Sequence, residues 1–406
     1  MKYFCLFASL TVFLFSACQQ TTSSDESESR SATEIYFPLM DNVKDQFEAE
    51  LYFNYVMLDL YYYYAHTRNE IADSYKAYLN KGTVSDERQK GYCTSSYYDV
   101  CYMYNQMKDP YTRYFDPAIA QQVLKNSKET QTVVGIGAKV EEVSTDSTQY
   151  LRVTNIYPDS PSEKAGLREN DIILQVDGFP ITTQENFETM CTGNLGDIVK
   201  IVVLRGTDTI VVANVLDEYM VPTVFVHYED SIPVIQITEF DVKTSKNGGT
   251  YTEFLSALEK TEGAKSTIID LRKNPGGDVG ECNSISAEFL SAGDTIISDV
   301  QAESVIENSG RDAKYAQYFD TLTYTANRDG LGKDRYYVLL ADTASASCAE
   351  VVLSAVSVNR KFPIVGQLSY GKSIAQAFII SGLNKGDPQG LALVTSAEGY
   401  DKNWQS

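Results

Sequence analysis

The sequence predicts a multidomain α/β protein, and three observations indicate this class. Residues 35–128 carry apolar residues at helical spacing, as in "FEAELYFNYVMLDLYYYYA". From about residue 129 the pattern changes to short strands separated by turns rich in Gly, Pro and Asp. Residues 217–406 alternate strand and helix patterns, which is typical of a largely parallel sheet covered by helices. The expected domains are therefore helical over 35–128, mostly β over 129–216 and α/β over 217–406.

The first eighteen residues, "MKYFCLFASLTVFLFSAC", predict a secretory signal. A lysine precedes an apolar run, and small residues lead to Cys18, which resembles a bacterial lipoprotein processing site. This resemblance implies that residues 1–17 are removed and that acylated Cys18 anchors the chain in a membrane. Gln19 takes the place of the aspartate associated with inner-membrane retention, so we expect the outer membrane, at its periplasmic face or its surface. An ordinary signal peptide with an incidental cysteine is the alternative.

Composition excludes some partners of the remaining chain. Residues 18–34 are rich in Ser, Thr and acidic residues and predict a disordered tether. The net charge of −21 repels phosphate backbones, so nucleic acid is not an expected partner. Beyond the signal, five scattered cysteines show no C-x-x-C spacing, so neither a disulfide framework nor a zinc site is indicated. Cys93 and Cys101 are able to pair, and most of the cysteines are expected as small buried residues.

The mostly β region carries a glycine loop, "GIGA", formed by Gly135, Ile136, Gly137 and Ala138. With the later segment "SPSEKAGLRENDIILQVDG", this loop resembles a bacterial-type PDZ domain. The resemblance implies that backbone amides of the loop hold the terminal carboxylate of a peptide, which adds to the sheet as an extra strand. In the alternative interpretation, the two glycines are only turn residues.

The segment "GQLSYGKS" at residues 366–373 fits the phosphate-loop template G-x-x-x-x-G-K-[ST]. That template requires a strand before it and a helix after it. Upstream, "KFPIV" fits a strand, but downstream "SIAQAFIISG" alternates small or polar with apolar residues and predicts a second strand. A nucleotide site is therefore not expected, and Lys372 needs a different role.

Two loops in the α/β region have compositions suited to catalysis. In "DLRKNPGGDVG", the adjacent Gly276 and Gly277 allow the backbone to present bare amides to a ligand. The small residues of "DTASASCAE" lead into a predicted helix and offer Ser347 as a nucleophile at a strand-to-helix turn. The alternative role of Ser347 is that of a helix N-cap.

A lysine is the expected base because the chain has only two histidines. His66 and His227 are isolated in the sequence, so a Ser-His-Asp triad is hard to assemble and a packed or surface role is expected for His66. A lysine accepts a proton only when it is neutral, so burial must lower its pKa from about 10.4 toward about 7–8.

Taken together, the motifs resemble the carboxyl-terminal processing peptidases, also called tail-specific proteases. The motifs that carry the resemblance are "DPYTRYFDP" at 109–117, the PDZ signature, "IIDLRKNPGG" at 268–277, "SASCAE" at 345–350 and "VGQLSYGKSIAQ" at 365–376. The resemblance implies a Clp protease/crotonase-like α/β core with an inserted PDZ domain and an N-terminal helical domain. It also implies a serine endopeptidase that acts near unstructured C-terminal tails of proteins and needs no metal or organic cofactor.

The family motifs also imply roles for individual residues. Ser347 falls on the nucleophile, Lys372 on the base and Gln376 on the residue that orients the lysine. Alternation along "KSIAQ" also places Lys372 and Gln376 on one face of a predicted strand. The backbone amides expected to bind the oxyanion are those of Gly276 or Gly277 and of Cys348. Cys348 and Ala349 stand where the family often has alanine and serine, and relatives usually continue beyond the final "LALVTSAEGYDKNWQS".

Two other functions are kept as alternatives. One is a non-catalytic PDZ lipoprotein that tethers protein C-termini. The other is a nucleotide-dependent enzyme, which would require ATP binding that is lost on Lys372→Ala. Expected partners are protein substrates with unstructured tails and a membrane, while homo-oligomer formation and the need for an adaptor are left open.

Overall fold

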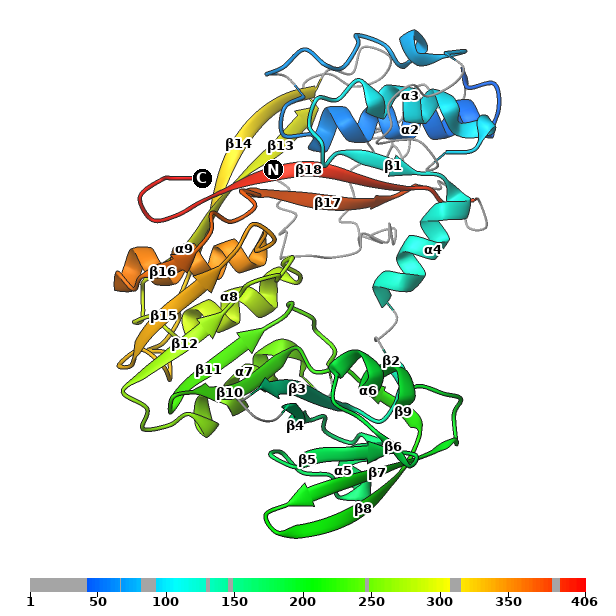
Figure 1. Ribbon diagram of the computed structural model, residues 1–406. Helices are drawn as coiled ribbons and strands as arrows, with labels where there is room; N and C mark the ends of the chain where they lie inside the picture. The colour runs from blue at the N-terminus through cyan, green and yellow to red at the C-terminus, as the bar shows by residue number, and fades with distance from the viewer. Residues whose placement is uncertain are drawn as a thin grey trace, which may run out of the picture. The chain divides into compact units, whose positions relative to one another are not determined.

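The computed structural model describes residues 42–65, 67–81, 93–128, 132–144, 149–244, 248–306, 315–381 and 388–406. The predicted signal and tether, Cys18 and His66 lie outside the described residues. The chain forms two compact units, whose elements are labelled in Figure 1. The first contains Met1–Lys128, Ile297–Tyr324 and Ser373–Ser406, and the second contains Glu129–Ile296 and Thr325–Lys372.

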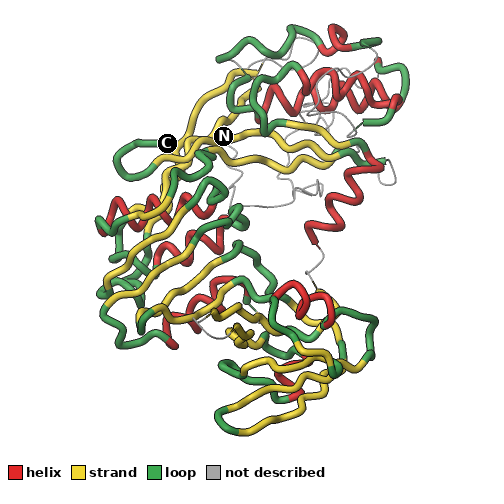
Figure 2. The backbone as a smooth tube through the Cα atoms, viewed as in Figure 1, coloured by secondary structure: helices red, strands yellow, loops and turns green. Residues whose placement is uncertain are grey.

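The second unit begins with the predicted β domain, which Figure 2 shows mainly as strands and which also contains the short helices α5 and α6. Its elements are β2 (Thr132–Gly135), β3 (Ala138–Ser144), β4 (Gln149–Ile156), α5 (Pro161–Ala165), β5 (Ile172–Val176), β6 (Phe179–Pro180), α6 (Gln184–Met190), β7 (Ile198–Arg205), β8 (Asp208–Val215) and β9 (Asp217–Met220). The main sheet has the order β3-β4-β5-β7-β8, so β3 is an edge strand, and β2 pairs with β9. Alternate inward residues such as Ile201 and Val203 fill its core.

The same unit continues into the α/β core. Its elements are β10 (Val224–Glu229), β11 (Ile232–Ile237), α7 (Gly249–Lys260), β12 (Ser266–Asp270), α8 (Val279–Ala287), β15 (Tyr336–Ala341), α9 (Cys348–Arg360) and β16 (Ile364–Gly366). The sheet order is β10-β11-β12-β15-β16, and every pairing after β10–β11 is parallel. The three helices share one apolar core with these strands. The predicted α/β architecture is confirmed.

The first unit joins N-terminal helices to strands from the end of the chain. Its elements are α2 (Gln46–Tyr61), η2 (Tyr75–Tyr78), η3 (Ser95–Tyr97), α3 (Tyr98–Asn105), β1 (Arg113–Phe115), α4 (Pro117–Lys128), β13 (Thr295–Ile306), β14 (Tyr315–Thr325), β17 (Ile374–Ile380) and β18 (Leu391–Tyr400). The sheet has the order β1-β18-β13-β14, and β17 also pairs with β18. Buried tyrosines of α2 and α3 and their flanks share a core with Ile379, Ala392 and Val394.

An independent N-terminal helical domain is therefore not confirmed. The helices of residues 42–128 bury their apolar side chains against strands that lie more than 200 residues later in the chain. Helical periodicity shows which residues are apolar, but it does not show which distant segment will cover them. The polar stretch 299–334 contributes most of β13 and all of β14 to the same sheet.

Two disulfides lie in the described residues. Cys93 pairs with Cys101, which was left open from the sequence, whereas the Cys282–Cys348 pair was not expected. Cys282 and Cys348 are separated by 66 residues, so rules based on short spacings between cysteines do not reveal this pair. Cys191 is a free, buried cysteine, as expected for a small apolar residue. Within the described ranges, no helix is both long enough and apolar enough to cross a bilayer.

Candidate active site

Three loops of the second unit follow the carboxyl ends of neighbouring parallel strands. Residues 271–278 follow β12, residues 342–347 follow β15, and residues 367–372 follow β16. The strands are in register at these ends, because Asp270 pairs with Leu340 and Ala341 pairs with Gly366. Carboxyl ends of parallel strands are the usual location of ligand sites in α/β sheets. The predicted Gly276, Ser347 and Lys372 each lie on one of these loops.

Ser347 lies at the turn from β15 into α9 and occupies the N-cap position of that helix. Its backbone has φ +55° and ψ −118°, whereas an N-cap residue is normally extended. A residue other than glycine in this region costs about 1–3 kcal/mol and persists only where its surroundings enforce it. Both roles predicted for Ser347 are therefore compatible: it is at the N-cap, in the strained turn geometry that exposes a nucleophile.

Hydrogen bonds join the Ser347 loop to the glycine loop. The Ala346 amide donates to the Asn274 carbonyl (2.9 Å), and the Ser345 hydroxyl donates to the Leu271 carbonyl (2.9 Å). The Lys273 amide donates to Asp342 Oδ1 (2.9 Å). This amide, with those of residues 344 and 345, holds the pKa of Asp342 below its usual range. The carboxylate is therefore charged at neutral pH and ties the two loops together.

Asn274 is a buried residue that sequence reasoning missed. Its Nδ2 donates to the Ile237 carbonyl (2.9 Å), and its Oδ1 accepts from the Gly276 amide (2.8 Å). One side chain therefore fixes the glycine turn to the end of β11. The sequence signal was its place inside "DLRKNPGG", but only the fold shows what its amide contacts.

The two predicted glycines have different surroundings. A Cβ on Gly276 (φ +105°) would lie 2.8 Å from Ser347 Cβ and 3.1 Å from the Cys348 nitrogen. A Cβ on Gly277 (φ +144°) would lie only 2.0 Å from the Phe240 carbonyl oxygen. The Gly276 amide is bonded to Asn274, whereas the Gly277 amide has no hydrogen-bond acceptor among the described residues. The structure therefore brings Gly276 against Ser347 and leaves the Gly277 amide available.

Lys372 is brought to the Ser347 loop by Glu350 in the first turn of α9. Glu350 Oε2 accepts from the Ser347 amide (2.7 Å) and from the Lys372 amide (2.9 Å). Glu350 Oε1 accepts from the Gly371 amide (2.6 Å). The backbones of the predicted nucleophile and the predicted base therefore contact the same carboxylate group, a feature that sequence reasoning missed.

The prediction that Lys372 lies on a strand is wrong. Strand β17 begins at Ile374, two residues later, and its register against β18 shifts between Ala375 and Gln376. Lys372 therefore lies outside the strand, and the alternation of side chains along β17 does not place it on the same face as Gln376. The extra residue at this shift is Ser396 of β18, and nothing in "KSIAQ" marks the start of β17 at Ile374.

Gln376 belongs to the first unit, where its side chain binds the "DPYTRYFDP" motif. Gln376 Nε2 donates to the Tyr111 carbonyl oxygen (2.6 Å). The carboxylate of buried Asp109 shapes this turn by accepting from the amides of Tyr111 (3.0 Å) and Thr112 (3.1 Å). The turn of this motif therefore supplies the carbonyl oxygen that holds the side chain of Gln376.

The phosphate-loop likeness of "GQLSYGKS" has a structural explanation. A Cβ on Gly366 would lie 2.0 Å from the Ala341 carbonyl oxygen, so glycine allows β16 to approach β15. Gly371 has φ +83°, which favours glycine. Strand β17 follows the segment, so the helix N-terminus that a phosphate loop requires is not there.

The predicted peptide-binding loop connects β2 to β3. Gly137 has φ +71°, and a Cβ there would lie 2.3 Å from Ser160 Cβ. The Ile136 carbonyl accepts from the Ser162 amide (2.7 Å), which fixes the loop to α5. Next along β3, Lys139 Nζ donates to Gln236 of the α/β core (3.2 Å) and lies 4.6 Å above the centre of the Phe225 ring. Burial lowers the pKa of Lys139, although the charge of Asp270 opposes this effect.

The Cys282–Cys348 disulfide joins α8 to the first residue of α9, directly after Ser347. We expect Cys282→Ala to destabilise the second unit by about 4 kcal/mol, from the entropy of closing a 66-residue loop. Cys101→Ala, which opens a loop of only 8 residues, is the control and should cost about 2.5 kcal/mol. Urea unfolding of both variants measures the difference. Equal unfolding midpoints for wild type and Cys282→Ala would contradict the structural role.

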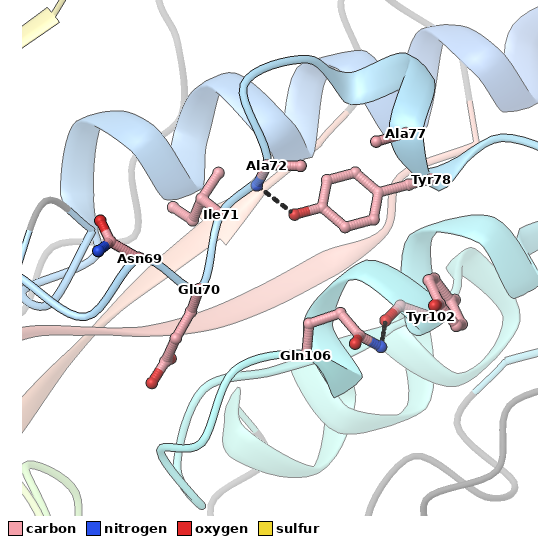
Figure 3. A pocket seen from close by; sticks show the side chains of 8 residues that line it. All are labelled: Asn69, Glu70, Ile71, Ala72, Ala77, Tyr78, Tyr102 and Gln106. Carbon is pink, nitrogen blue, oxygen red and sulfur yellow. Dashed lines mark hydrogen bonds between the residues drawn. The ribbon is translucent and has the colours of Figure 1, made fainter.

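A surface pocket of the first unit is not the candidate site (Figure 3). Its lining residues are Asn69, Glu70, Ile71, Ala72, Ala77, Tyr78, Tyr102 and Gln106. The Ala72 amide donates to the Tyr78 hydroxyl (2.7 Å), and no serine or lysine lines the pocket.

His227 lies on β10, outside the three loops, with Nε2 3.9 Å from Glu229 Oε1. Among the described residues, no cluster of His, Cys, Asp or Glu could hold a metal ion.

Comparison with known families identifies both domains. Residues 231–403 match the model of Peptidase family S41, and residues 152–205 match that of the PDZ domain. The chain contains an S41 peptidase domain and a PDZ domain. The S41 match includes every predicted site residue from Gly276 to Gln376, whereas the loop from Gly135 to Ala138 lies just before the PDZ match.

Curated relatives of this chain are named as carboxy-terminal processing proteases. The carboxy-terminal processing protease CtpA of Bacillus subtilis is 30% identical over 280 residues, which are 68% of this chain and 54% of the relative. A carboxy-terminal-processing protease of Bartonella bacilliformis is 25% identical over 280 residues, or 68% and 60% of the two chains. The matched part thus spans somewhat more than half the length of these relatives. The solved photosystem II D1 C-terminal processing protease is 17% identical over 90% of each chain, with a TM-score of 0.49. The matches to the two family models and the relative in Bacillus subtilis confirm the family resemblance predicted from the motifs.

Proposed function

We propose that this protein is a serine endopeptidase that cleaves proteins near their C-terminal tails, with Ser347 as nucleophile and Lys372 as base. The observation that carries this proposal is the strained Ser347 turn, whose amide shares Glu350 Oε2 with the Lys372 amide. The names of the relatives support the same reaction class. The test is cleavage of an unfolded substrate with an apolar C-terminus by wild type and Ser347→Ala protein. If the wild-type protein binds this substrate but does not cleave it, the alternative function, a non-catalytic PDZ scaffold, would be favoured.

The reaction is acyl transfer in two steps. As the Ser347 Oγ–carbon bond forms, the hydroxyl proton passes to the neutral Lys372 amine and the carbonyl electrons move onto oxygen. Breakage of the peptide C–N bond then releases the amine, which takes the proton from the lysine. Water attacks the ester and gives a proton to Lys372. Breakage of the ester C–O bond restores the Ser347 hydroxyl with that proton.

The oxyanion would be bound by the amides of Gly277 and Cys348. The Gly276 amide is a weaker candidate because it already donates to Asn274 Oδ1. Cys348 is the first residue of α9, where the amide has no acceptor within the helix and the helix dipole favours negative charge. A single donor of this kind is worth about 3 kcal/mol of transition-state stabilisation. Gln376 would help to place the lysine, as the family resemblance implies.

The PDZ domain would capture the substrate tail. Strand β3 follows the loop of Gly135, Ile136, Gly137 and Ala138 and has a free edge in the sheet order, which suits addition of a peptide strand. We expect a peptide with a free C-terminal carboxylate to bind Ser347→Ala protein at least about tenfold more tightly than the same peptide with a C-terminal amide. Fluorescence anisotropy of labelled peptides measures both affinities.

Gly137→Ala should remove this preference, since its methyl group would collide with Ser160 at the N-cap of α5 and so distort the binding loop. Gly178→Ala is the control, because Gly178 also has a positive φ (+84°) but open space around it. If the acid and amide peptides bind equally well to the unmodified loop, the PDZ domain does not recognise the carboxylate.

We also propose that the protein is anchored to the bacterial envelope, at the outer membrane, through acylated Cys18. The N-terminal sequence supports this proposal, and two disulfides suit an oxidising compartment. Cys18→Ser should move the protein from the membrane fraction to the soluble fraction. An unchanged distribution would argue against a lipid anchor.

A further inference from the structure

We propose that Glu350 is a positioning residue for the Ser347–Lys372 pair, because its carboxylate ties the backbone of the nucleophile to that of the base. This inference rests on the proposed function. Ser347 and Lys372 lie on different loops, which follow β15 and β16. Something must therefore hold the two loops at a fixed separation if a proton is to pass between their side chains.

Glu350 makes three hydrogen bonds to backbone amides. Its Oε2 accepts from Ser347 (2.7 Å) and Lys372 (2.9 Å), and its Oε1 accepts from Gly371 (2.6 Å). Hydrogen bonds to a charged acceptor are roughly twice as strong as those between neutral groups. The carboxylate also lies in the first turn of α9, where the helix dipole stabilises negative charge. Both loops are thus held by one well-stabilised group.

Capping of α9 explains only one of these three bonds. A glutamate at the third helical position returns to the N-cap amide in an ordinary capping box, and the Ser347 bond is of this kind. The bonds to Gly371 and Lys372 reach a separate segment that the helix does not need for its own stability. Buried Val352, Leu353 and Val356 already anchor α9 in the core. The additional bonds therefore serve the arrangement of the two loops.

The consequence concerns the rate of the chemical step. A base must lie within about 2.6–3.2 Å of the proton that it takes, and a misplacement of about 1 Å can cost roughly 100-fold in rate. Without the carboxylate, the Lys372 segment loses two amide acceptors and the Ser347 turn loses one. Substrate capture by the PDZ domain uses other residues, so kcat should fall while KM changes little.

Glu48 provides a matched control in the first unit. It is likewise the third residue of its helix, α2, and its carboxylate accepts from the Lys44 amide (3.0 Å) and the Tyr75 hydroxyl (2.9 Å). It belongs to none of the three loops. Glu48→Ala should therefore lower thermal stability while leaving kcat per folded molecule within about twofold of wild type.

The experiment compares wild type, Glu350→Ala, Glu350→Gln and Glu48→Ala by kcat, KM and thermal melting, with an unfolded substrate that ends in a free apolar C-terminus. We expect Glu350→Ala to lose about 100-fold or more in kcat with KM within about threefold. Glu350→Gln should lose less, because one carbonyl oxygen can still accept from Ser347 and Lys372 while the amide nitrogen cannot accept from Gly371. Circular dichroism at the assay temperature gives the folded fraction of each variant.

A kcat of Glu350→Ala that falls only in proportion to the folded fraction would overturn the positioning role. If Glu350→Ala does not fold, the kcat of Glu350→Gln tests the proposal instead. A kcat of Glu350→Gln equal to that of wild type would overturn the positioning role of Glu350. Failure of the proposed function would look different, because Ser347→Ala would then cleave the substrate as well as wild type does. Inactive Ser347→Ala together with fully active Glu350 variants would refute this inference alone.

Discussion

Ser347→Ala and Lys372→Ala are each expected to reduce cleavage of an unfolded, tail-bearing substrate by about 10⁴-fold or more. Ser347→Ala removes the oxygen that forms the ester, and Lys372→Ala removes the group that takes its proton. Residues that act as one unit are not additive, so the double variant should be about as inactive as either single variant. Initial rates of product formation, followed by gel electrophoresis and mass spectrometry, measure all three.

Lys372→Arg separates the base from the positive charge. Arginine stays protonated at every assay pH, so this variant should be as inactive as Lys372→Ala even though the charge is kept. In the wild type, a lysine base predicts that activity rises between about pH 7 and 9 as the amine loses its proton. Tail peptides should still bind Ser347→Ala protein with unchanged affinity, which shows that the variant is folded. Equal cleavage by wild type and Ser347→Ala would exclude the Ser-Lys mechanism.

Gly276→Ala is expected to lower kcat by about 100-fold or more. The new methyl group would lie 2.8 Å from Ser347 Cβ and 3.1 Å from the Cys348 nitrogen, so it would displace the nucleophile and cover an oxyanion donor. One lost donor costs about 3 kcal/mol, or roughly 10²-fold in rate, before any displacement of Ser347 is counted. The positive φ of +105° adds about 1–2 kcal/mol of backbone strain. Steady-state kinetics with thermal melting measures both effects.

Gly178→Ala is also the control for this prediction. It imposes the same kind of backbone strain at φ +84°, but no atom lies within 4 Å of the added carbon. Its kcat should stay within about twofold of wild type despite a lower melting temperature. A Gly276→Ala protein that keeps wild-type kcat would show that this turn does not face the reacting atoms.

Local sequence patterns predicted most of the second unit correctly. Alternating residues in β7 and continuous apolar runs such as "STIID" and "YYVLLA" indicate the buried faces of strands, and glycines mark the loops between them. The first unit was predicted less well. Its core combines α2 and α3 with β17 and β18, and pairing at that separation depends on side-chain packing that periodicity does not encode.

The candidate site shows the same limit. Ser347, Lys372 and Gly276 were predicted from motifs, and the structure places them on adjacent loops. Glu350 and Asn274 were missed because each side chain bonds to the backbone of another segment, Glu350 to the Lys372 amide and Asn274 to the Ile237 carbonyl, and no sequence spacing reveals such bonds. The strand placement of Lys372 failed because β17 begins only at Ile374, and the alternation of residue types does not mark where a strand starts.

Covalent labelling with a fluorophosphonate tests the central claim most directly, because this reagent reacts with an activated serine hydroxyl. After tryptic digestion, mass spectrometry should locate a single phosphonate on the peptide that contains Ser347. Labelling should disappear in Ser347→Ala and become at least about 100-fold slower in Lys372→Ala. A phosphonate on another serine, or labelling of Ser347 at an unchanged rate without Lys372, would contradict the Ser-Lys pair.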